Sequence, residues 1–368
     1  MHSSRNVHQI SSASGVSRER VRLTLQRFSG DSMGARNARQ VWRRRSGLLV
    51  DLYADAEHGL GEASPLPGYS TDTLADAETA LAGLNVRSLW RALQLPKIQA
   101  ALKAVAELLP STLPAARMAL ETAALDWRAR RDGVSAAALL GVGPRGERAL
   151  AWLVGATEHA DLRSAEAAGY RHFKLKIGAP GDLAAEMATV MEVRRSLSSD
   201  SRLRLDANQS WTEAQAQFAC RALAATEVEF IEEPCRGLTR PLDTDIKIAL
   251  DESLRDCPRD ELATLVRRTG AGVVVLKPML LGGITRCLEL GSQASALGLG
   301  VVVSHSFDGP VALIAAGALA LALPTESAQG LAPHAGLATW PPVGLPIGGG
   351  VLRTWTEPGL GIARGDLH

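Results

Sequence analysis

Two lysines at alternate positions of a short apolar segment are the first residues in this sequence that could do chemistry. Lys174 and Lys176 lie in Phe-Lys-Leu-Lys-Ile-Gly at 173–178, and in a β-strand both point to the face opposite the apolar residues. Same-face neighbours on a strand lie about 6.5 to 7 Å apart, so each ammonium makes the other harder to charge. A lysine whose pKa is lowered in this way can accept a proton near neutral pH. Taken alone, however, this segment fits a solvated edge strand with two surface lysines better than it fits a catalytic site.

The ends of further apolar segments favour the chemical interpretation. Five such segments end in a charged residue: Lys176, Asp206, Glu232, Asp251 and Lys277. Any one of the acids could be a helix N-cap or a surface charge. Five charged residues in register, with a lysine on each side of three acids, indicate one shared site.

Three carboxylates on neighbouring strands repel one another unless a cation lies between them. Oxygen ligands of this kind suit Mg²⁺, with Mn²⁺ as an alternative, so Asp206, Glu232 and Asp251 are the candidate metal ligands. Glu232 is chosen over Glu233 because strand alternation from Phe230 points Glu232 inward. A metal flanked by two lysines suits removal of a proton α to a carboxylate, which passes through an enediolate.

The elements that carry these residues recur along the second half of the chain. Short Val-, Leu- and Ile-rich strand candidates, each followed by an Ala-rich amphipathic stretch, lie at 150–154, 173–177, 203–206, 228–232, 246–251, 273–277 and 300–304. Units of roughly 20 to 30 residues repeated seven or eight times indicate an α/β fold with a parallel (β/α) barrel of TIM type. In such barrels the active site lies at the carboxyl ends of the strands.

The first part of the chain predicts an α+β domain. Residues 21–26 alternate and residues 48–53 are apolar, so they predict an antiparallel pair, with a loop at 30–37 between them. The arginines at 43–45 predict a solvated strand edge. Glycines and prolines at 59–70 exclude regular structure and, with Leu66 and Tyr69, predict a lid, whereas 115–131 reads as a helix.

Four segments are expected in all. Residues 1–17 predict a disordered leader, 18–135 a capping domain, 136–335 the barrel, and 336–368 a closing segment that packs on the capping domain.

Composition narrows the function classes. The chain has 368 residues and a net charge of +1, which gives no case for nucleic acid or an anionic membrane as partner. No segment predicts a signal peptide or a membrane span. The four cysteines stand far apart, which suits a reducing cytoplasm and argues against a zinc site.

The motifs resemble the enolase superfamily, specifically its muconate-cycloisomerase subgroup, over nearly the whole chain. They are Gly-Glu-Ala-Ser-Pro-Leu-Pro-Gly-Tyr-Ser at 61–70, Lys-x-Lys at 174–176, Asp-Ala-Asn at 206–208, Glu-Glu-Pro at 232–234, Asp-Glu-Ser at 251–253 and Lys-Pro at 277–278. Arg204, Cys235 and the lid sequence are most similar to the o-succinylbenzoate synthase family. The resemblance implies a modified (β/α)7β barrel with an N-terminal α+β capping domain.

The resemblance also implies roles for individual residues. Lys176 would be the general base and then the acid that assists loss of a β-hydroxyl, and Lys277 would stabilise the enediolate. Substrate binding would fall to Lys174, which would also tune Lys176, and to Arg204, Asn208, Ser304 and Ser306. His305 is as compatible with a structural hydrogen bond as with a direct role. The implied substrate is a small-molecule carboxylate, and the implied reaction is the Mg²⁺-dependent dehydration that forms o-succinylbenzoate for menaquinone.

Other functions remain open on the sequence. An N-acylamino-acid racemase or dipeptide epimerase of the same subgroup would use the same two lysines, one on each face of its substrate. A barrel that had lost catalysis would lack a base or a metal ligand, and none is missing here. A phosphate-binding barrel would need a Gly-rich turn after strand seven or eight, which Gly309 and Gly317 do not form convincingly. The oligomeric state stays open.

Overall fold

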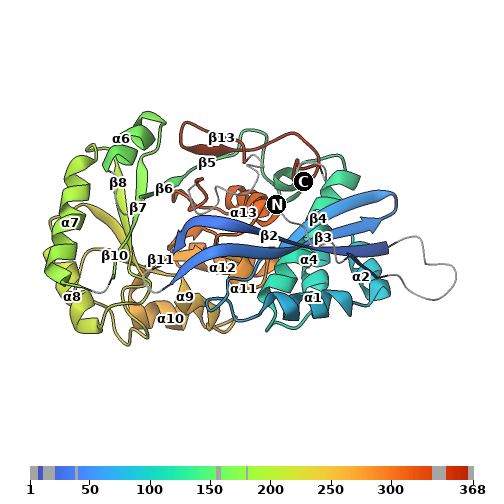
Figure 1. Ribbon diagram of the computed structural model, residues 1–368, viewed down its shortest axis with the longest axis horizontal. Coiled ribbons are helices and arrows are strands. Elements are labelled where there is room, and N and C mark those ends of the chain that lie inside the picture. The colour runs from blue at the N-terminus through green and yellow to red at the C-terminus, as the bar shows by residue number, and fades with distance from the viewer. Residues whose placement is uncertain are drawn as a thin grey trace.

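The computed structural model describes residues 7–10, 21–37, 40–154, 159–179, 181–333 and 345–363. Its centre is a barrel of seven parallel strands in consecutive order (Figure 1). The strands are β6 (Ala151–Val154), β7 (His172–Lys176), β8 (Arg202–Asp206), β9 (Val228–Glu232), β10 (Lys247–Leu250), β11 (Ala271–Leu276) and β12 (Gly300–Val303). All seven predicted strands are confirmed to within two residues at either end.

A short eighth segment closes the barrel between β12 and β6. Gln329 forms a parallel bridge with Leu150, and Gly330 forms one with Ser304. The amide of Ala151 donates to the carbonyl of Gln329 at 2.8 Å, so the sheet edge on β6 is covered. The fold is therefore the modified (β/α)7β barrel that the motifs imply.

Helices surround the barrel strands on most sides. They are α6 (His159–Ala167), α7 (Leu183–Ser196), α8 (Glu213–Ala222), α9 (Glu252–Arg255), α10 (Leu262–Thr269), α11 (Pro278–Leu281), α12 (Ile284–Ala296) and α13 (Pro310–Ala322). The prediction that a helical stretch follows every strand is wrong after β9, where residues 233–246 contain no helix. Pro234, Gly237 and Pro241 interrupt this short connection.

A capping layer of one sheet and several helices packs against the barrel. The antiparallel sheet has the order β1 (Val7–Ile10), β2 (Val21–Arg36), β3 (Val41–Ala54) and β4 (Glu57–Ala63). Its helices are α1 (Leu74–Ala82), α2 (Val86–Leu93), α3 (Ile98–Ala106), α4 (Pro114–Arg131) and α5 (Ala136–Leu139). Helix α4 confirms the prediction for 115–131, and Pro114 opens it. Helix α13 is buried on nearly all faces because it lies between this layer and β12.

Close packing of β4 on α4 requires glycine. A Cβ atom at Gly61 would lie 1.9 Å from the carbonyl oxygen of Ala119, and one at Gly59 would lie 2.1 Å from that of Ala123. The strand backbone thus lies directly on the helix backbone, and the predicted absence of regular structure at 59–70 is wrong for the part that forms β4. Residues 64–70 make the turns of the lid.

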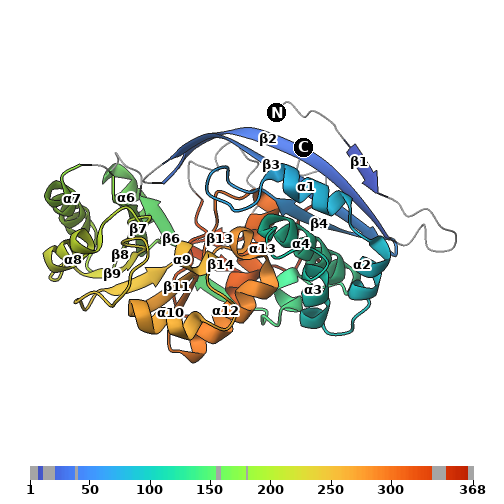
Figure 2. The same cartoon turned by 90° about the horizontal axis from the view of Figure 1, so that it is seen from below.

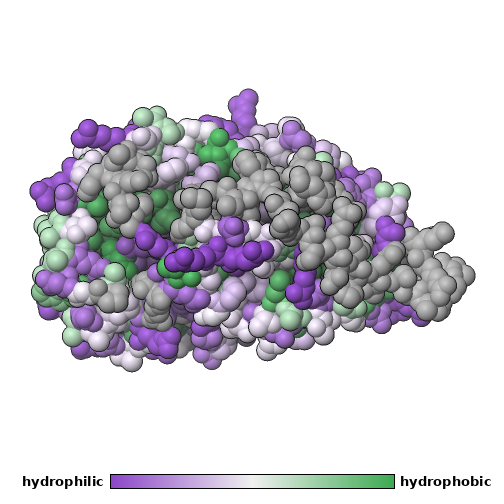
Figure 3. Space-filling model, in the orientation of Figure 1, coloured by the Kyte–Doolittle hydropathy of each residue, from purple (hydrophilic) through white to green (hydrophobic). Residues whose placement is uncertain are grey.

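Two further predictions for the capping layer are wrong. The expected loop at 30–37 is instead the end of β2, in which Gly30 pairs with Arg45 and Asp31 with Arg44 before a register shift. The long ribbon of β2 and β3 reaches across to the barrel strands (Figure 2), and cross-strand pairing there overrides the loop-like composition. A hydrophilic strip lies over the barrel-side end of this ribbon (Figure 3). Arg43 and Arg44 are exposed as expected, but Arg45 is 1% exposed.

The ends of the chain add short elements. Of the predicted leader, residues 7–10 form β1 and pair with β2, so disorder is wrong for these four, and the rest of 1–17 lies outside the described residues. Strands β13 (Ile347–Gly348) and β14 (Val351–Arg353) form a small sheet with β5 (Glu147–Ala149). The amide of Leu360 donates to Asp126 on α4 at 2.7 Å. The four segment boundaries themselves stay a prediction.

Candidate active site

A cavity lies at the carboxyl ends of the barrel strands, beneath the capping layer. It encloses about 790 Å³, its open mouth included. Strand register aligns the charged ends, because Lys176 pairs with Asp206 and Asp206 pairs with Glu232. Of the ten residues predicted for the site, nine line the cavity: Lys174, Lys176, Arg204, Asp206, Asn208, Glu232, Lys277, Ser304 and Ser306. The tenth, Asp251, lies against Lys277.

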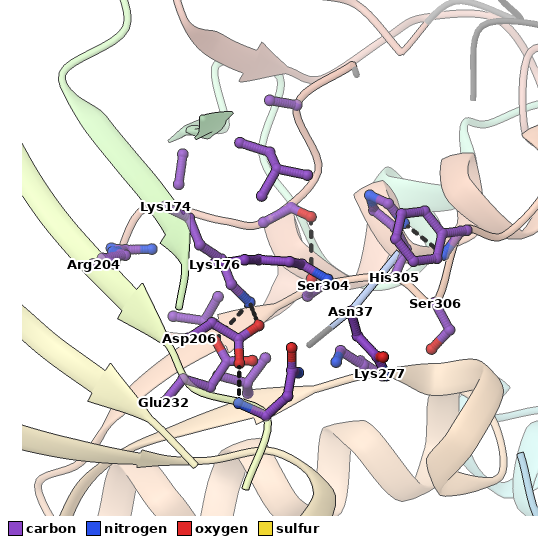
Figure 4. A pocket seen from close by; sticks show the side chains of 18 of the residues that line it. Asn37, Lys174, Lys176, Arg204, Asp206, Glu232, Lys277, Ser304, His305 and Ser306 are labelled. Atoms are coloured by element: carbon purple, nitrogen blue, oxygen red, sulfur yellow. Dashed lines mark hydrogen bonds and ion pairs between the residues drawn. The ribbon is translucent and has the colours of Figure 1, made fainter. Parts of the chain in front are cut away.

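Lys174 lies between two of the acids. Its Nζ is 2.9 Å from Asp206 Oδ2 and 2.7 Å from Glu232 Oε2 (Figure 4). Burial favours the neutral amine, but the two carboxylates outweigh burial and raise the pKa of Lys174. Lys174 therefore stays charged and cannot act as a base near neutral pH.

Lys176, two residues further along β7, has a different environment. Its Nζ donates to the carbonyl oxygen of Arg36 at 2.6 Å and lies 5.3 Å from the centre of the Phe307 ring. Burial lowers the pKa of Lys176 to about 8, and the charge of Lys174 acts in the same direction. An appreciable fraction of Lys176 is therefore neutral near pH 8, as a general base requires.

Lys277, on the other flank, is held as a cation. It forms a buried ion pair with Asp251, and its Nζ lies 3.3 Å from the hydroxyl of Tyr69 in the lid. Burial opposes the charge, but the carboxylate of Asp251 outweighs burial and raises the pKa of Lys277. The pKa values of the two lysines that the sequence pairs as catalytic residues are thus shifted in opposite directions.

The three acids are all buried. Burial raises the pKa of Asp206, but the surrounding lysines, Lys174 first among them, outweigh burial and lower it to about 2. Glu232 faces the cavity, whereas Glu233 turns away and accepts hydrogen bonds from the amides of Asp251 and Ser253, each at 2.7 Å. This geometry supports the choice of Glu232 over Glu233 at the cavity.

The chemistry of these acids fits a divalent cation, although lysines hold them here. Within the described ranges, no three His, Cys, Asp or Glu side chains are arranged as a metal site, and the ammonium groups of Lys174 and Lys277 contact the carboxylates of Asp206 and Asp251. Glu232 Oε1, however, is buried and has no hydrogen-bond partner in this part of the chain. Buried carboxylates on three adjacent strands, one with an orphaned oxygen, match the hard oxygen donors that Mg²⁺ prefers.

Two of the predicted substrate-binding residues bond mainly to the protein. Arg204 donates two hydrogen bonds to Glu229, at 2.7 and 2.9 Å, and a third to the carbonyl of Ala328 at 2.7 Å. Asn208 has a positive φ of 45° and donates from Nδ2 to Glu252 at 3.3 Å. Arg204 thus lines the cavity, but its guanidinium is hydrogen-bonded to Glu229 and Ala328.

The segment after β12 lies across the cavity from the acids (Figure 4). Ser304 Oγ donates to the carbonyl of Gly330 at 3.3 Å. Ser306 Oγ is buried and has no partner among the described residues. Nδ1 of His305 accepts from the amide of Phe307 at 3.0 Å, which is a structural hydrogen bond.

Several cavity residues are missed by the sequence analysis. Trp42 and Phe307 line the cavity with Tyr69, and the rings of Trp42 and Phe307 lie 6.0 Å apart. Their only sequence signal is an aromatic residue beside a polar segment, which is too common to single out. Asn37, at the end of the β2–β3 ribbon, also reaches the cavity.

Two family models match this chain. A family model described as "Enolase C-terminal domain-like" matches residues 157–364, and one described as "MenC, N-terminal domain" matches residues 33–120. An o-succinylbenzoate synthase of Enterobacter sp. (strain 638) is 31% identical over 78% of this chain and 83% of its own. The chain belongs to the o-succinylbenzoate synthase family. Another relative with this name, from Pectobacterium atrosepticum, is 30% identical over 88% of this chain and 95% of its own.

Solved structures agree with this assignment to the enolase superfamily. An L-Ala-D/L-Glu epimerase from Bacillus subtilis has a TM-score of 0.79 at 25% identity and covers 93% of this chain and 98% of its own. A muconate lactonizing enzyme from Pseudomonas fluorescens has a TM-score of 0.78 at 26% identity over 92% and 95%. A dipeptide epimerase from Methylococcus capsulatus, complexed with Mg and a dipeptide, shares the fold with a TM-score of 0.75 at 24% identity over 92% and 98%.

As a member of the o-succinylbenzoate synthase family, the chain is an enzyme of the lyase class. None of the described helices has the length and apolar character needed to cross a membrane.

Proposed function

We propose that the chain catalyses the Mg²⁺-dependent syn elimination of water from 2-succinyl-6-hydroxy-2,4-cyclohexadiene-1-carboxylate, which yields o-succinylbenzoate for menaquinone biosynthesis. One observation carries the proposal. A lysine with a lowered pKa, Lys176, and a lysine held as a cation, Lys277, line one cavity together with buried acids. Family membership supports the same reaction.

The two lysines divide the chemistry. Neutral Lys176 takes the proton α to the substrate carboxylate, and the resulting ammonium then donates a proton to the β-hydroxyl, which leaves as water. Lys277 stays charged and stabilises the negative charge that develops on the carboxylate oxygens. A single residue can act as base and then acid because the elimination is syn.

The remaining charged residues would bind the metal ion and set the charges around Lys176 and Lys277. Asp206, Glu232 and Asp251 would hold Mg²⁺, whose positive charge stabilises the enediolate when the ion is bound. Lys174 contacts both Asp206 and Glu232, lowers the pKa of Asp206 and disfavours a proton on Lys176. Mn²⁺ offers the same oxygen coordination.

Substrate recognition would come from the opposite wall. Ser306, whose Oγ has no partner in the described structure, and Ser304 would bind the succinyl carboxylate. On the side of the acids, Asn208 and Arg204 would line the cavity near Asp206, with Arg204 fixed by Glu229.

The proposed location of the enzyme is the cytoplasm. All four cysteines are free thiols, which supports a reducing compartment.

A second candidate is racemisation of N-acylamino acids or epimerisation of dipeptides. The observation that favours it is a cavity with lysines on two strands, since proton exchange on both faces of a substrate needs two amines. The similarity to the Bacillus subtilis epimerase supports it as well.

One experiment separates the two. The enzyme with Mg²⁺ is given the cyclohexadiene substrate, and the ultraviolet spectrum is followed. In parallel, it is incubated with an N-succinyl amino acid in deuterated buffer. Dehydration supports the proposed function, whereas deuterium exchange and racemisation without dehydration would overturn it in favour of the second candidate.

A further inference from the structure

Arg45 is a buried arginine that the reaction described above does not use. It lies in β3 of the capping layer, is 1% exposed, and donates hydrogen bonds to three backbone carbonyls. Nη2 donates to Ser64 at 2.7 Å, Nη1 to Pro65 at 3.4 Å and Nε to Phe307 at 3.1 Å. One guanidinium therefore joins the lid to the segment that follows β12, which lies far away in the sequence.

Two buried acids lie near Arg45. Burial lowers the pKa of the Arg45 guanidinium, and the carboxylates of Asp308 and Glu62 offset only part of this effect. Glu62, from β4, accepts hydrogen bonds from the amides of Gly309 and Val311 at the start of α13. A Cβ atom at Gly309 would lie 2.3 Å from Glu62 Oε1, so the loop lies directly against this carboxylate. The capping layer thus holds both ends of the short stretch from Phe307 to Val311.

Phe307 is the residue that this arrangement fixes. Its φ is +55°, a conformation that a bulky side chain adopts only when its surroundings impose it. Its ring lies 5.3 Å from Nζ of Lys176 and 6.0 Å from the ring of Trp42. The carbonyl of Phe307 is the acceptor for Arg45, so the hydrogen bond acts on the strained residue itself.

We propose that Arg45 is a positioning residue: by binding the carbonyls of the lid and of Phe307, it keeps the Phe307 ring over the amine of Lys176. The proposal rests on the proposed function in taking Lys176 as the base. The ring, whose centre lies 5.3 Å from the Lys176 amine, covers one side of the amine and so limits both its contact with bulk water and the directions in which it can point. The same guanidinium then holds both the lid and the residue that covers the base.

The first test measures access to Lys176 without any turnover. The protein is treated with an amine-acylating reagent, and mass spectrometry follows labelling of Lys176 against exposed Lys103 as internal reference. Arg45→Lys keeps the positive charge but cannot reach three carbonyls. We expect it, and Phe307→Leu, to raise the Lys176 labelling rate at least roughly 3-fold, because the ring contact is lost. Arg44→Lys is the matched control, since Arg44 is exposed and bonds Ser29.

The second test asks whether Arg45 acts through Phe307. Each single variant is expected to lower kcat by roughly 10- to 100-fold, the scale of a misplaced catalytic group. The double variant should lose no more than the larger single loss, whereas independent effects would multiply. If Arg45 had only a structural role, Arg45→Lys would have a lower melting temperature, but Lys176 in the folded protein would be labelled at the wild-type rate.

The outcomes separate this inference from the proposed function. Wild-type labelling and kcat in Phe307→Leu, or multiplicative losses in the double variant, would overturn the role of Arg45. If Arg45→Lys does not fold, Phe307→Leu still decides, because it leaves every Arg45 hydrogen bond to backbone in place. A wild-type enzyme that does not dehydrate the cyclohexadiene substrate would contradict only the proposed function, since labelling needs no substrate.

Discussion

Lys277 and Asp251 form a buried ion pair that joins the ends of β11 and β10. Asp251 is also the third acid of the predicted metal set, so a divalent cation must compete with an ammonium for this carboxylate. Lys174 holds the other two acids in the same manner. Lysines therefore neutralise the acids in this structure, and cation binding is expected to rearrange these contacts.

Metal binding should appear as stabilisation of the folded protein. We expect Mg²⁺ added to chelator-treated enzyme to raise the unfolding free energy by about 2.7 kcal/mol at 100 times the dissociation constant. Glu232→Gln should abolish this effect because it removes the carboxylate with the orphaned oxygen. Thermal unfolding with and without Mg²⁺ measures it. Glu229→Gln is the control. Glu229 binds Arg204 and is not one of the proposed metal ligands, so this variant should keep the Mg²⁺ response.

The pH profile should report Lys176. Its pKa is lowered to about 8 from the ordinary 10.5, and the active form is the neutral amine, which accumulates above the pKa. The value of kcat/KM should therefore rise with pH and level off above about pH 8. Bound Mg²⁺ should shift this plateau to a lower pH, because a nearby cation lowers the pKa of Lys176 further. A rising limb near pH 10.5 would mean that an unperturbed lysine is the base.

Arg204 should matter for stability more than for turnover. Arg204→Met removes three hydrogen bonds and leaves Glu229 without its guanidinium partner. We expect a loss of about 2 to 3 kcal/mol, below the usual range for a fully buried pair because Glu229 keeps some contact with water. Urea unfolding measures this. A large increase in KM with unchanged stability would instead place Arg204 on the substrate.

Gly61 should be intolerant of any side chain. The Cβ of Gly61→Ala would meet the backbone carbonyl of Ala119 at 1.9 Å, and a backbone atom cannot rotate away. Moving β4 off α4 should cost roughly 1 to 3 kcal/mol or more. Gly143→Ala, with open space around its Cβ position, is the control. Equal melting temperatures for the two variants would contradict the close packing.

The sequence predicts the barrel and its charged residues because both depend on local rules. Apolar runs mark the parallel strands, and parallel pairing brings their carboxyl ends, with Asp206 and Glu232, to one edge of the sheet. It does not predict the roles of Lys174 and Lys176 separately, since the difference arises from which carboxylates each amine meets in three dimensions.

Residues fixed by long-range contacts escape sequence reasoning altogether. Arg45 reads as one of three surface arginines, and only the carbonyls of the lid and of Phe307 explain its burial. The same holds for the end of β2, which pairs with β3 despite its glycines and polar residues. In both cases tertiary contacts override local composition.

The most direct test of the account is the turnover of Lys176→Ala. Lys176 lies at the end of β7 and is only partly buried, so its loss removes an amine and leaves the core intact. With Mg²⁺ and the cyclohexadiene substrate, we expect dehydration to fall by at least roughly 10²- to 10⁴-fold. The melting temperature and the Mg²⁺ response should stay at wild-type values. Dehydration at an undiminished rate in this variant would contradict the central claim, because the base would have to be another residue.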